Sequence, residues 1–340
     1  MSFSPSSMPR SAPTLRSAAP IVLRGAHPTL DAETLKRASQ RLFDSYAPNS
    51  RRAFAGAFAE FTLYCLNQRA FALPCEPACL IGYVERLVER GLKRASIEVQ
   101  IAAISAAHLA ADLPNPRLNS DFRAAWKRLC RERLSKRQKQ ARALTWDDIR
   151  VVLAVLDPKL RADLRDAALV CVAYDAMLRR SELVSLEVAD IEREADGSGR
   201  LLLKRSKVDQ EGAGALLYLA PPTMLRINAW LNAAQIDHGA IFRTLKGNQR
   251  KQPGAALNPA TVREIFRRLS KKAGIPLERI SGHSTRVGAT QDLLAAHIGR
   301  DEIKRAGRWK SDVMIVRYGA NLDAGRSGMA ALAKVQRRAG

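Results

Sequence analysis

Acidic residues are scarce in this sequence, and no hydrophobic run is long enough to cross a membrane. Only 33 of the 340 residues are Asp or Glu, against 56 Lys and Arg, which gives a formal net charge of +23. The absence of any run of about 18 apolar residues argues against a transmembrane helix. A hydrophobic fraction of 46% is still enough for real cores, so a globally disordered chain is not expected. The length corresponds to about two domains.

Cysteines are also few, and their positions suggest neither disulfides nor a metal site. An odd and scattered set in a long chain predicts reduced thiols in a cytoplasm, and this set is Cys65, Cys75, Cys79, Cys130 and Cys171. The pair Cys75 and Cys79 has no second pair and no nearby histidine, so a zinc site is not expected. No other group of His, Cys and Asp residues has ligand spacing, and we predict no metal site.

The excess positive charge is spread over the whole chain. Residues 1–143 carry 23 basic and 11 acidic side chains, and the remaining residues carry 33 and 22. So large a charge is costly in self-repulsion and is typical of proteins that bind a polyanion. Two basic halves therefore favour a nucleic acid bound by both domains. The alternatives are a merely basic protein, or a membrane-surface protein, which no lipidation motif or long basic amphipathic helix supports.

Composition divides the chain into four segments. Residues 1–30 are rich in Ser, Pro and Ala and contain no acid, as expected of a disordered basic arm. Residues 31–130 follow helical spacing and predict an all-helical domain. Residues 131–143 are dense in charge and are typical of a basic interdomain linker. Residues 144–340 form the second domain.

The second domain is predicted to be mostly helical, with one β-hairpin. A capping-box-like pair, Thr145 and Asp148, marks its first helix. The hairpin covers 199–220, where two leucine-rich stretches flank the polar turn 209–212. Helices are expected over 145–156, 160–177, 221–233, 258–273, 283–297, 300–307, 311–318 and 328–337. The first domain contributes helices over 51–67, 77–91, 95–111 and 119–133, so the fold class is mainly α with a small antiparallel β-sheet.

Two residue pairs in the second domain have a spacing suited to phosphate chemistry. Arg179 and Glu182 are three apart, and an arginine held by a carboxylate after an apolar stretch presents a pre-oriented fork to phosphate oxygens. His283 and Arg286 have the same spacing and would share a helix face. Each pair could equally be an ordinary surface ion pair or a helix end.

Three further residues carry little information individually. Lys207 lies near a predicted hairpin turn, Trp309 would normally be a core residue, and Tyr318 would normally pack at a helix end. Their order with the two pairs, R-x-x-E, K, H-x-x-R, W and Y, is specific. In that order, and in the residues that surround these motifs, the sequence resembles the tyrosine recombinases of the phage integrase family. The resemblance is clear over about 145–335 and weaker over 31–130.

The resemblance implies a role for each of these residues in cleaving DNA. Tyr318 would be the nucleophile that attacks the scissile phosphate. Arg179 and Arg286 would bind the non-bridging oxygens, and His283 would bind the phosphate and assist proton transfer. Guanidiniums supply fixed positive potential where negative charge concentrates in the transition state, which is usually the largest catalytic contribution.

The remaining roles concern proton transfer and support. Lys207 would protonate the 5′-oxygen as it leaves, and Glu182 would brace the arginines. Trp309 could donate its indole N–H but could not transfer a proton. The covalent phosphotyrosine keeps the free energy of the broken bond until a 5′-hydroxyl reverses the attack. This chemistry requires neither ATP nor metal, so no cofactor is expected.

The resemblance also implies how the protein meets DNA. A helical core-binding domain and the catalytic domain would form a C-shaped clamp on double-stranded DNA that carries an inverted repeat, in the cytoplasm of a bacterium or phage-infected cell. Five basic residues near helix starts are candidates for DNA contacts, with a solvated surface as the equal alternative: Arg51, Arg52, Lys93, Arg94 and Arg263.

The end of the chain predicts a docking helix. Two glycines make the stretch 325–328 flexible, and Met329, Leu332 and Val335 then form one apolar stripe. A helix this short must bury its stripe on another surface. That surface could belong to its own domain. The resemblance implies instead that the helix docks into a neighbouring protomer, which would build a homotetramer on two DNA sites.

Two other classes of protein share most of these features. A type IB topoisomerase or a telomere resolvase would use the same chemistry, and relaxation of supercoils by a monomer without strand exchange would identify it. A catalytically silent DNA-binding relative would keep the fold. The complete set of catalytic residue types argues against the silent relative, since a protein that only binds DNA has no use for Tyr318.

Overall fold

The structure is a computed structural model, and it describes residues 23, 25–27, 30–135, 140–204, 214–246, 252–325 and 328–336. The chain divides into two compact units after residue 138, within the stretch 131–143 whose composition predicts a linker. Most of the predicted arm lies outside the described residues. None of the described helices is long and apolar enough to cross a membrane.

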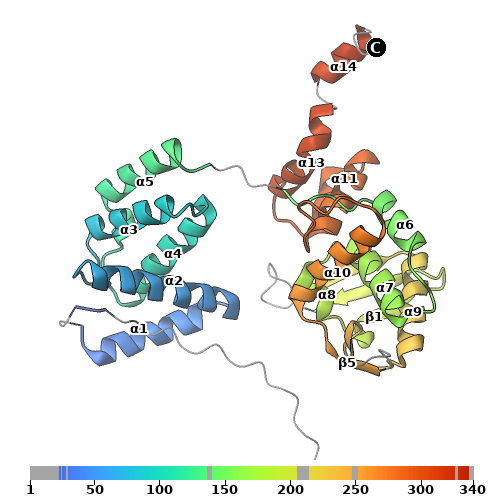
Figure 1. Cartoon of the computed structure of the whole chain (residues 1–340), viewed down its shortest axis with the longest axis horizontal. Coiled ribbons are helices and arrows are strands. Elements are labelled where there is room, and N and C mark those ends of the chain that lie inside the picture. The colour runs from blue at the N-terminus through green and yellow to red at the C-terminus, as the bar shows by residue number, and fades with distance from the viewer. Residues whose placement is uncertain are drawn as a thin grey trace, which may run out of the picture. The chain divides into compact units, whose positions relative to one another are not determined.

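The first unit is built of helices (Figure 1). Its elements are α1 (Ala32–Ser45), α2 (Pro48–Asn67), α3 (Pro77–Glu89), α4 (Arg94–Ala110), the 3-10 turn η1 (Pro116–Leu118) and α5 (Ser120–Glu132). The side chains of Asp31 and Asn119 accept hydrogen bonds from first-turn amides of α1 and α5, and prolines occupy the first positions of α2 and α3. The predicted helices are confirmed to within three residues at each end.

All five α-helices of the first unit contribute side chains to its core. Phe58 and Phe61 of α2, Tyr83 of α3 and Ile97 of α4 are buried. Helix α4 packs along α2 and also against α1. His108 is buried at the end of α4, where its Nε2 accepts a hydrogen bond from the backbone N–H of Cys75 (2.9 Å). Burial lowers the pKa of this imidazole, so it is a neutral structural residue.

The second unit surrounds a central buried helix. Its helical elements are α6 (Trp146–Ala154), α7 (Arg161–Asp175), α8 (Arg180–Val184), η2 (Val188–Asp190), α9 (Pro221–Ala234), α10 (Pro259–Lys272), α11 (Ser284–Ala295), α12 (Arg300–Gly307), α13 (Val313–Gly325) and α14 (Gly328–Val335). Residues 168–173 of α7 are at most 1% exposed. Helices α6, α8, α9, α10 and α11 all pack against α7, which is therefore the central helix of this unit (Figure 1). The predicted capping box at the start of α6 is confirmed, because Thr145 and Asp148 each bond the other's backbone N–H.

Two small antiparallel sheets complete the second unit. The first has the order β1 (Ile191–Arg193), β2 (Gly199–Leu203) and β3 (Ala215–Leu219), with Leu201 paired with Leu217 and both side chains buried. This pairing confirms the predicted hairpin. The second sheet, β4 (Arg243–Lys246) with β5 (Gln252–Ala256), was not predicted. Pro253 and Gly254 in β5 are residues that the sequence pattern assigns to loops.

Helix α13 is longer than predicted. The prediction that the helix ends at residue 318 is wrong, because it continues to Gly325. A glycine in the interior of a helix costs about 1 kcal/mol relative to alanine. Gly319 is buried, however, and α13 packs against α11. The carbonyl of Tyr318 also accepts a hydrogen bond from the side chain of Gln291 in α11 (3.0 Å). Tertiary packing therefore outweighs the local preference of the glycine.

Gly288 of α11 lies against the backbone of the segment that leads into α6. A Cβ atom at Gly288 would be 1.8 Å from the carbonyl oxygen of Leu144, whose N–H donates to the carbonyl of Ser284 (2.9 Å). Because backbone must shift, we expect Gly288→Ala to lower the free energy of unfolding by about 3 kcal/mol. Urea denaturation measures this change. The control is Gly56→Ala, where a Cβ meets nothing within 4 Å, and equal stability of the two variants would contradict the prediction.

Candidate active site

Arg179 and Glu182 meet at the start of α8. The backbone N–H of Arg179 donates to Glu182 Oε2 (2.9 Å), and its Nη1 donates to Oε1 (2.6 Å). The prediction that both lie on one helix face is wrong in detail, because Arg179 has an extended backbone and precedes the helix. Glu182 is only 4% exposed, which distinguishes this contact from a surface ion pair. Glu182 therefore holds the guanidinium of Arg179 in place, at the end of the segment that connects α7 to α8.

Arg286 of α11 is buried beside this pair. It is 2% exposed, its Nη1 donates to the carbonyl of Met177, and its Nη2 donates to the carbonyl of Gly307 (3.0 Å). Burial, followed by the positive charges of Arg179 and Arg308, lowers the pKa of Arg286 to about 10. The side chain therefore remains charged at pH 7.

Trp309 lies between Arg286 and Tyr318. The guanidinium carbon of Arg286 is 5.3 Å from the centroid of the Trp309 ring, and the rings of Trp309 and Tyr318 meet edge to face with centroids 5.7 Å apart. Tyr318, from α13, is 7% exposed. A Cβ at residue 307 would lie 2.6 Å from the indole, so the glycine there allows the ring its position. The structure thus brings three of the predicted residues into one row.

His283 is the residue that precedes α11. Partial loss of hydration, together with the positive charges of Arg286, Arg180 and Arg179, lowers the pKa of its imidazole. A free imidazole titrates near pH 6.5, so this one is neutral at pH 7 and can accept a proton. His283 therefore lies within the field of both predicted phosphate-binding arginines.

Arg308 belongs to the same cluster, although the sequence did not predict it. Its Nη2 lies 3.0 Å from Glu182 Oε2, so two guanidiniums share one carboxylate. Burial opposes ionisation of Glu182, but the hydrogen bonds from Arg179 and the charge of Arg308 outweigh it and lower the pKa of the carboxyl. An arginine just after a helix is normally solvated, so nothing in the sequence marks this one.

The predicted DNA-contacting residues differ in their surroundings. The guanidinium of Arg51 lies 3.9 Å from the centroid of the Phe43 ring, and Arg94 pairs with Glu98 (2.9 Å). The other three are exposed, namely Arg52, Lys93 and Arg263. Lys207, the predicted general acid, lies outside the described residues.

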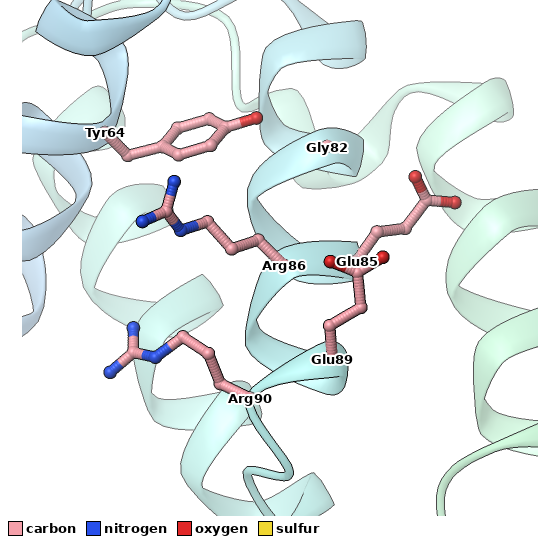
Figure 2. Close-up of a pocket in the computed structure, with 6 residues that line it drawn as sticks. All are labelled: Tyr64, Gly82, Glu85, Arg86, Glu89 and Arg90. Carbon is pink, nitrogen blue, oxygen red and sulfur yellow. The ribbon is translucent and has the colours of Figure 1, made fainter.

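A separate hollow of about 530 Å³ lies in the first unit between α2 and α3. Figure 2 shows Tyr64 of α2 beside Arg86 of α3, with Glu85 and Glu89 on the same helix and Arg90 just after its end. The opposite charges balance, and Arg90 is already paired with Glu60. None of the predicted site residues lines this hollow. It therefore does not have the positive potential that a phosphate site requires.

The cluster in the second unit has a definite chemical capacity. Three guanidiniums and one carboxylate lie together beside a phenol, and the imidazole of His283 lies within their electrostatic field. Fixed positive charge suits an anion such as a phosphodiester, and the phenol is a nucleophile once it loses its proton. Within the described residues, no three His, Cys, Asp or Glu side chains are placed to hold a metal ion.

Comparison with known proteins gives relatives of one kind. An integrase/recombinase xerD homologue of Selenomonas ruminantium is 28% identical over 291 residues, which cover 83% of this chain and 84% of the relative. The recombinase cre of Escherichia phage P1 is 26% identical over 282 residues, 78% of this chain and 82% of the relative. Both relatives are recombinases, in agreement with the order of residue types that the sequence shares with the tyrosine recombinases.

Solved structures show the same fold. The XerH site-specific recombinase bound to palindromic difH substrate has a TM-score of 0.60 at 14% identity, over 87% of this chain and 86% of that chain. The Tn1549 transposon integrase in complex with transposon right end DNA has a TM-score of 0.58 at 15% identity, over 88% and 99%. The phage integrase family matches residues 142–324, more than half of the sequence. This chain therefore belongs to the phage integrase family and is a tyrosine site-specific recombinase.

Proposed function

We propose that this recombinase cleaves and rejoins duplex DNA through a 3′-phosphotyrosine on Tyr318, with a 5′-hydroxyl as the leaving group. The observation that carries the proposal is the row formed by Tyr318, Trp309 and Arg286, with ring centroids 5.7 Å apart and a guanidinium 5.3 Å from the indole. This arrangement supports the proposal because it brings a nucleophile and an anion-binding group from two helices to the same indole.

Arg179 and Arg286 bind the non-bridging oxygens of the scissile phosphate. Each guanidinium is held by other protein groups, Arg179 by Glu182 and Arg286 by the carbonyls of Met177 and Gly307. The donors are therefore fixed before the substrate arrives, and little reorganisation is needed as charge develops. Trp309 contributes an N–H donor and a wall against which Tyr318 packs.

Proton transfer requires two further groups. Attack forms a bond between Tyr318 Oη and phosphorus and breaks the bond from phosphorus to the 5′-oxygen. The neutral imidazole of His283 accepts the phenolic proton, and Lys207 gives a proton to the departing 5′-oxygen. The phosphotyrosine conserves the free energy of the bond, so rejoining needs only a 5′-hydroxyl and no ATP or metal.

The DNA partner is a duplex with an inverted repeat, bound by two protomers. The helical first unit acts as a core-binding domain and contacts the duplex that the catalytic unit cleaves, with Arg52, Lys93 and Arg263 among the contacting residues. The net charge of +23 supports this, as does a structural neighbour that is bound to a palindromic substrate. We place the reaction in the cytoplasm of a bacterium or phage-infected cell, in line with the bacterial and phage origin of the relatives.

The decisive experiment measures covalent adduct formation and strand exchange. The DNA site is first selected from a pool of random-sequence duplexes, as the inverted repeat that the protein enriches. The substrate is a nicked duplex that carries this repeat, and the buffer contains EDTA. We expect an adduct that survives a denaturing gel, and recombinant products when two labelled sites are mixed. Relaxation of plasmid without exchange would indicate a topoisomerase, and hairpin ends a telomere resolvase. Binding without any adduct would indicate a silent relative.

We propose that four protomers assemble on two DNA sites through α14. Met329, Leu332 and Val335 form its apolar stripe and are 65%, 41% and 80% exposed, so the stripe is not buried in its own chain. A two-turn helix with an unburied stripe is unstable alone. A contact that each protomer gives and receives can close into a ring.

Deleting residues 326–340 tests this assembly, because α13 ends at Gly325 and remains whole. We expect unchanged binding to one half-site, and loss of cooperative binding to two half-sites. Gel-shift titration on one-arm and two-arm duplexes measures both. The matched variant replaces Met329, Leu332 and Val335 with Asn and should behave like the deletion. Cooperative binding and recombination by the truncated protein would mean that α14 has no role in assembly.

A further inference from the structure

Arg308 has a backbone conformation that arginine rarely adopts. It ends α12 with φ 52° and ψ 50°, in the left-handed region, where glycine is the usual residue. A non-glycine residue held in this region next to a proposed active site suggests a functional constraint. Arg69 and Arg279 also have a positive φ, so it is the side chain of Arg308 rather than its backbone that must indicate its role.

That side chain is only 10% exposed, and its acceptors lie in one segment that runs from the end of α7 to α8. Its Nη2 donates to Glu182 Oε2 (3.0 Å) and to the carbonyl of Met177 (3.0 Å), and its Nη1 donates to the carbonyl of Ala176 (2.9 Å). Glu182 is also the partner of Arg179, and the Met177 carbonyl is also the acceptor for Arg286. Arg308 is therefore joined through a single shared acceptor to each of the two phosphate-binding arginines.

We propose that Arg308 is a positioning residue of the cleavage reaction, which fixes Arg179 and Arg286 relative to each other and offsets the charge of Glu182. The inference rests on the proposed function. Arg308 itself is not placed on the phosphate, because both of its terminal nitrogens donate to carbonyls or to the carboxylate and its Nε is buried.

Counting charges shows why a third guanidinium is useful. Arg179 and Arg286 with Glu182 alone have a net charge of +1, which a phosphodiester monoanion would already neutralise. Arg308 raises the net charge to +2, while attack by a phenolate adds a second negative charge to the phosphorane. The added charge therefore favours the transition state over the bound substrate, which raises the cleavage rate rather than the affinity.

The test compares Arg308→Gly with the wild-type protein on nicked duplexes that carry the selected inverted repeat. Glycine suits the backbone conformation, and Glu182 keeps Arg179 as its partner, so the variant should fold and bind DNA within about threefold of the wild-type affinity. We expect the single-turnover rate of adduct formation to fall about 100-fold, the size of effect that small misplacements of catalytic groups produce.

A methylphosphonate at the scissile position separates charge and positioning from general structural damage. Its phosphorus carries no charged non-bridging oxygen, so the loss caused by Arg308→Gly should shrink to about tenfold or less. A purely structural defect would slow both substrates equally. Arg308→Lys keeps the charge without the fork and should recover part of the rate, which also provides a folded variant if the glycine variant is unstable.

Gln235→Gly is the matched control. Gln235 ends α9 in the same left-handed conformation (φ 53°, ψ 48°), but its side chain is exposed. Its replacement should leave cleavage of both substrates unchanged. Cleavage at the wild-type rate by Arg308→Gly, or equal losses on both substrates, would overturn the role proposed for Arg308 and leave the proposed function intact. Absence of any adduct from the wild-type protein would overturn the proposed function, and this inference with it.

Discussion

Tyr318→Phe should bind its DNA site normally and form no covalent adduct. The substitution removes only the phenolic oxygen, and the ring keeps its contact with Trp309. Without that oxygen no bond to phosphorus can form, so the loss should be complete rather than partial. A denaturing gel of the nicked substrate measures the adduct, and a gel shift under native conditions measures binding.

Two other tyrosines of the second unit serve as comparisons. Tyr218 of β3 is 61% exposed, and Tyr218→Phe should form the adduct at the wild-type rate. Tyr174 is engaged structurally, because its hydroxyl donates to Asp292 (2.6 Å) and burial raises its pKa. If Tyr318→Phe still formed an adduct, the nucleophile would be another residue, and peptide mapping of the adduct would identify it.

The sequence predicted the elements of this fold better than it predicted their ends. Apolar periodicity and capping residues define most helices to within a few residues, and the leucine pattern of 199–220 identifies the hairpin. Helix α13 is longer than predicted because its packing against α11 compensates for the cost of Gly319. Strand β5 was missed because proline and glycine are rare in strands, and only its pairing with β4 makes it one.

The same distinction applies to the proposed site. Arg179, Glu182, Arg286, Trp309 and Tyr318 were found from the order of residue types along the chain, and the structure brings them into one cluster. Their contacts could not be predicted, because they depend on the left-handed turn at Met177, whose carbonyl accepts from Arg286. Arg308 was missed for the same reason, since its partners come from segments more than a hundred residues away.

Lys207→Ala should cleave ordinary DNA about 10² to 10⁴ times more slowly, the range that a positioned general acid contributes. An alkoxide is a poor leaving group without a proton, whereas a thiolate needs little help because thiols have a pKa of about 8.5. Replacing the 5′-bridging oxygen with sulfur should therefore restore the variant to within about tenfold of the wild-type rate on the same substrate. The measurement is the single-turnover rate of adduct formation on matched oxygen and sulfur duplexes.

Lys204→Ala is the control for this prediction. Lys204 follows β2 and pairs with the buried carboxylate of Asp190 (2.6 Å), so its loss affects local stability rather than the leaving group. Any slowing in this variant should be equal on the oxygen and sulfur substrates. The diagnostic quantity is therefore the ratio of the two rates, which should rise by orders of magnitude in Lys207→Ala and stay constant in Lys204→Ala. A constant ratio in both variants would mean that Lys207 holds the phosphate and that another group protonates the 5′-oxygen.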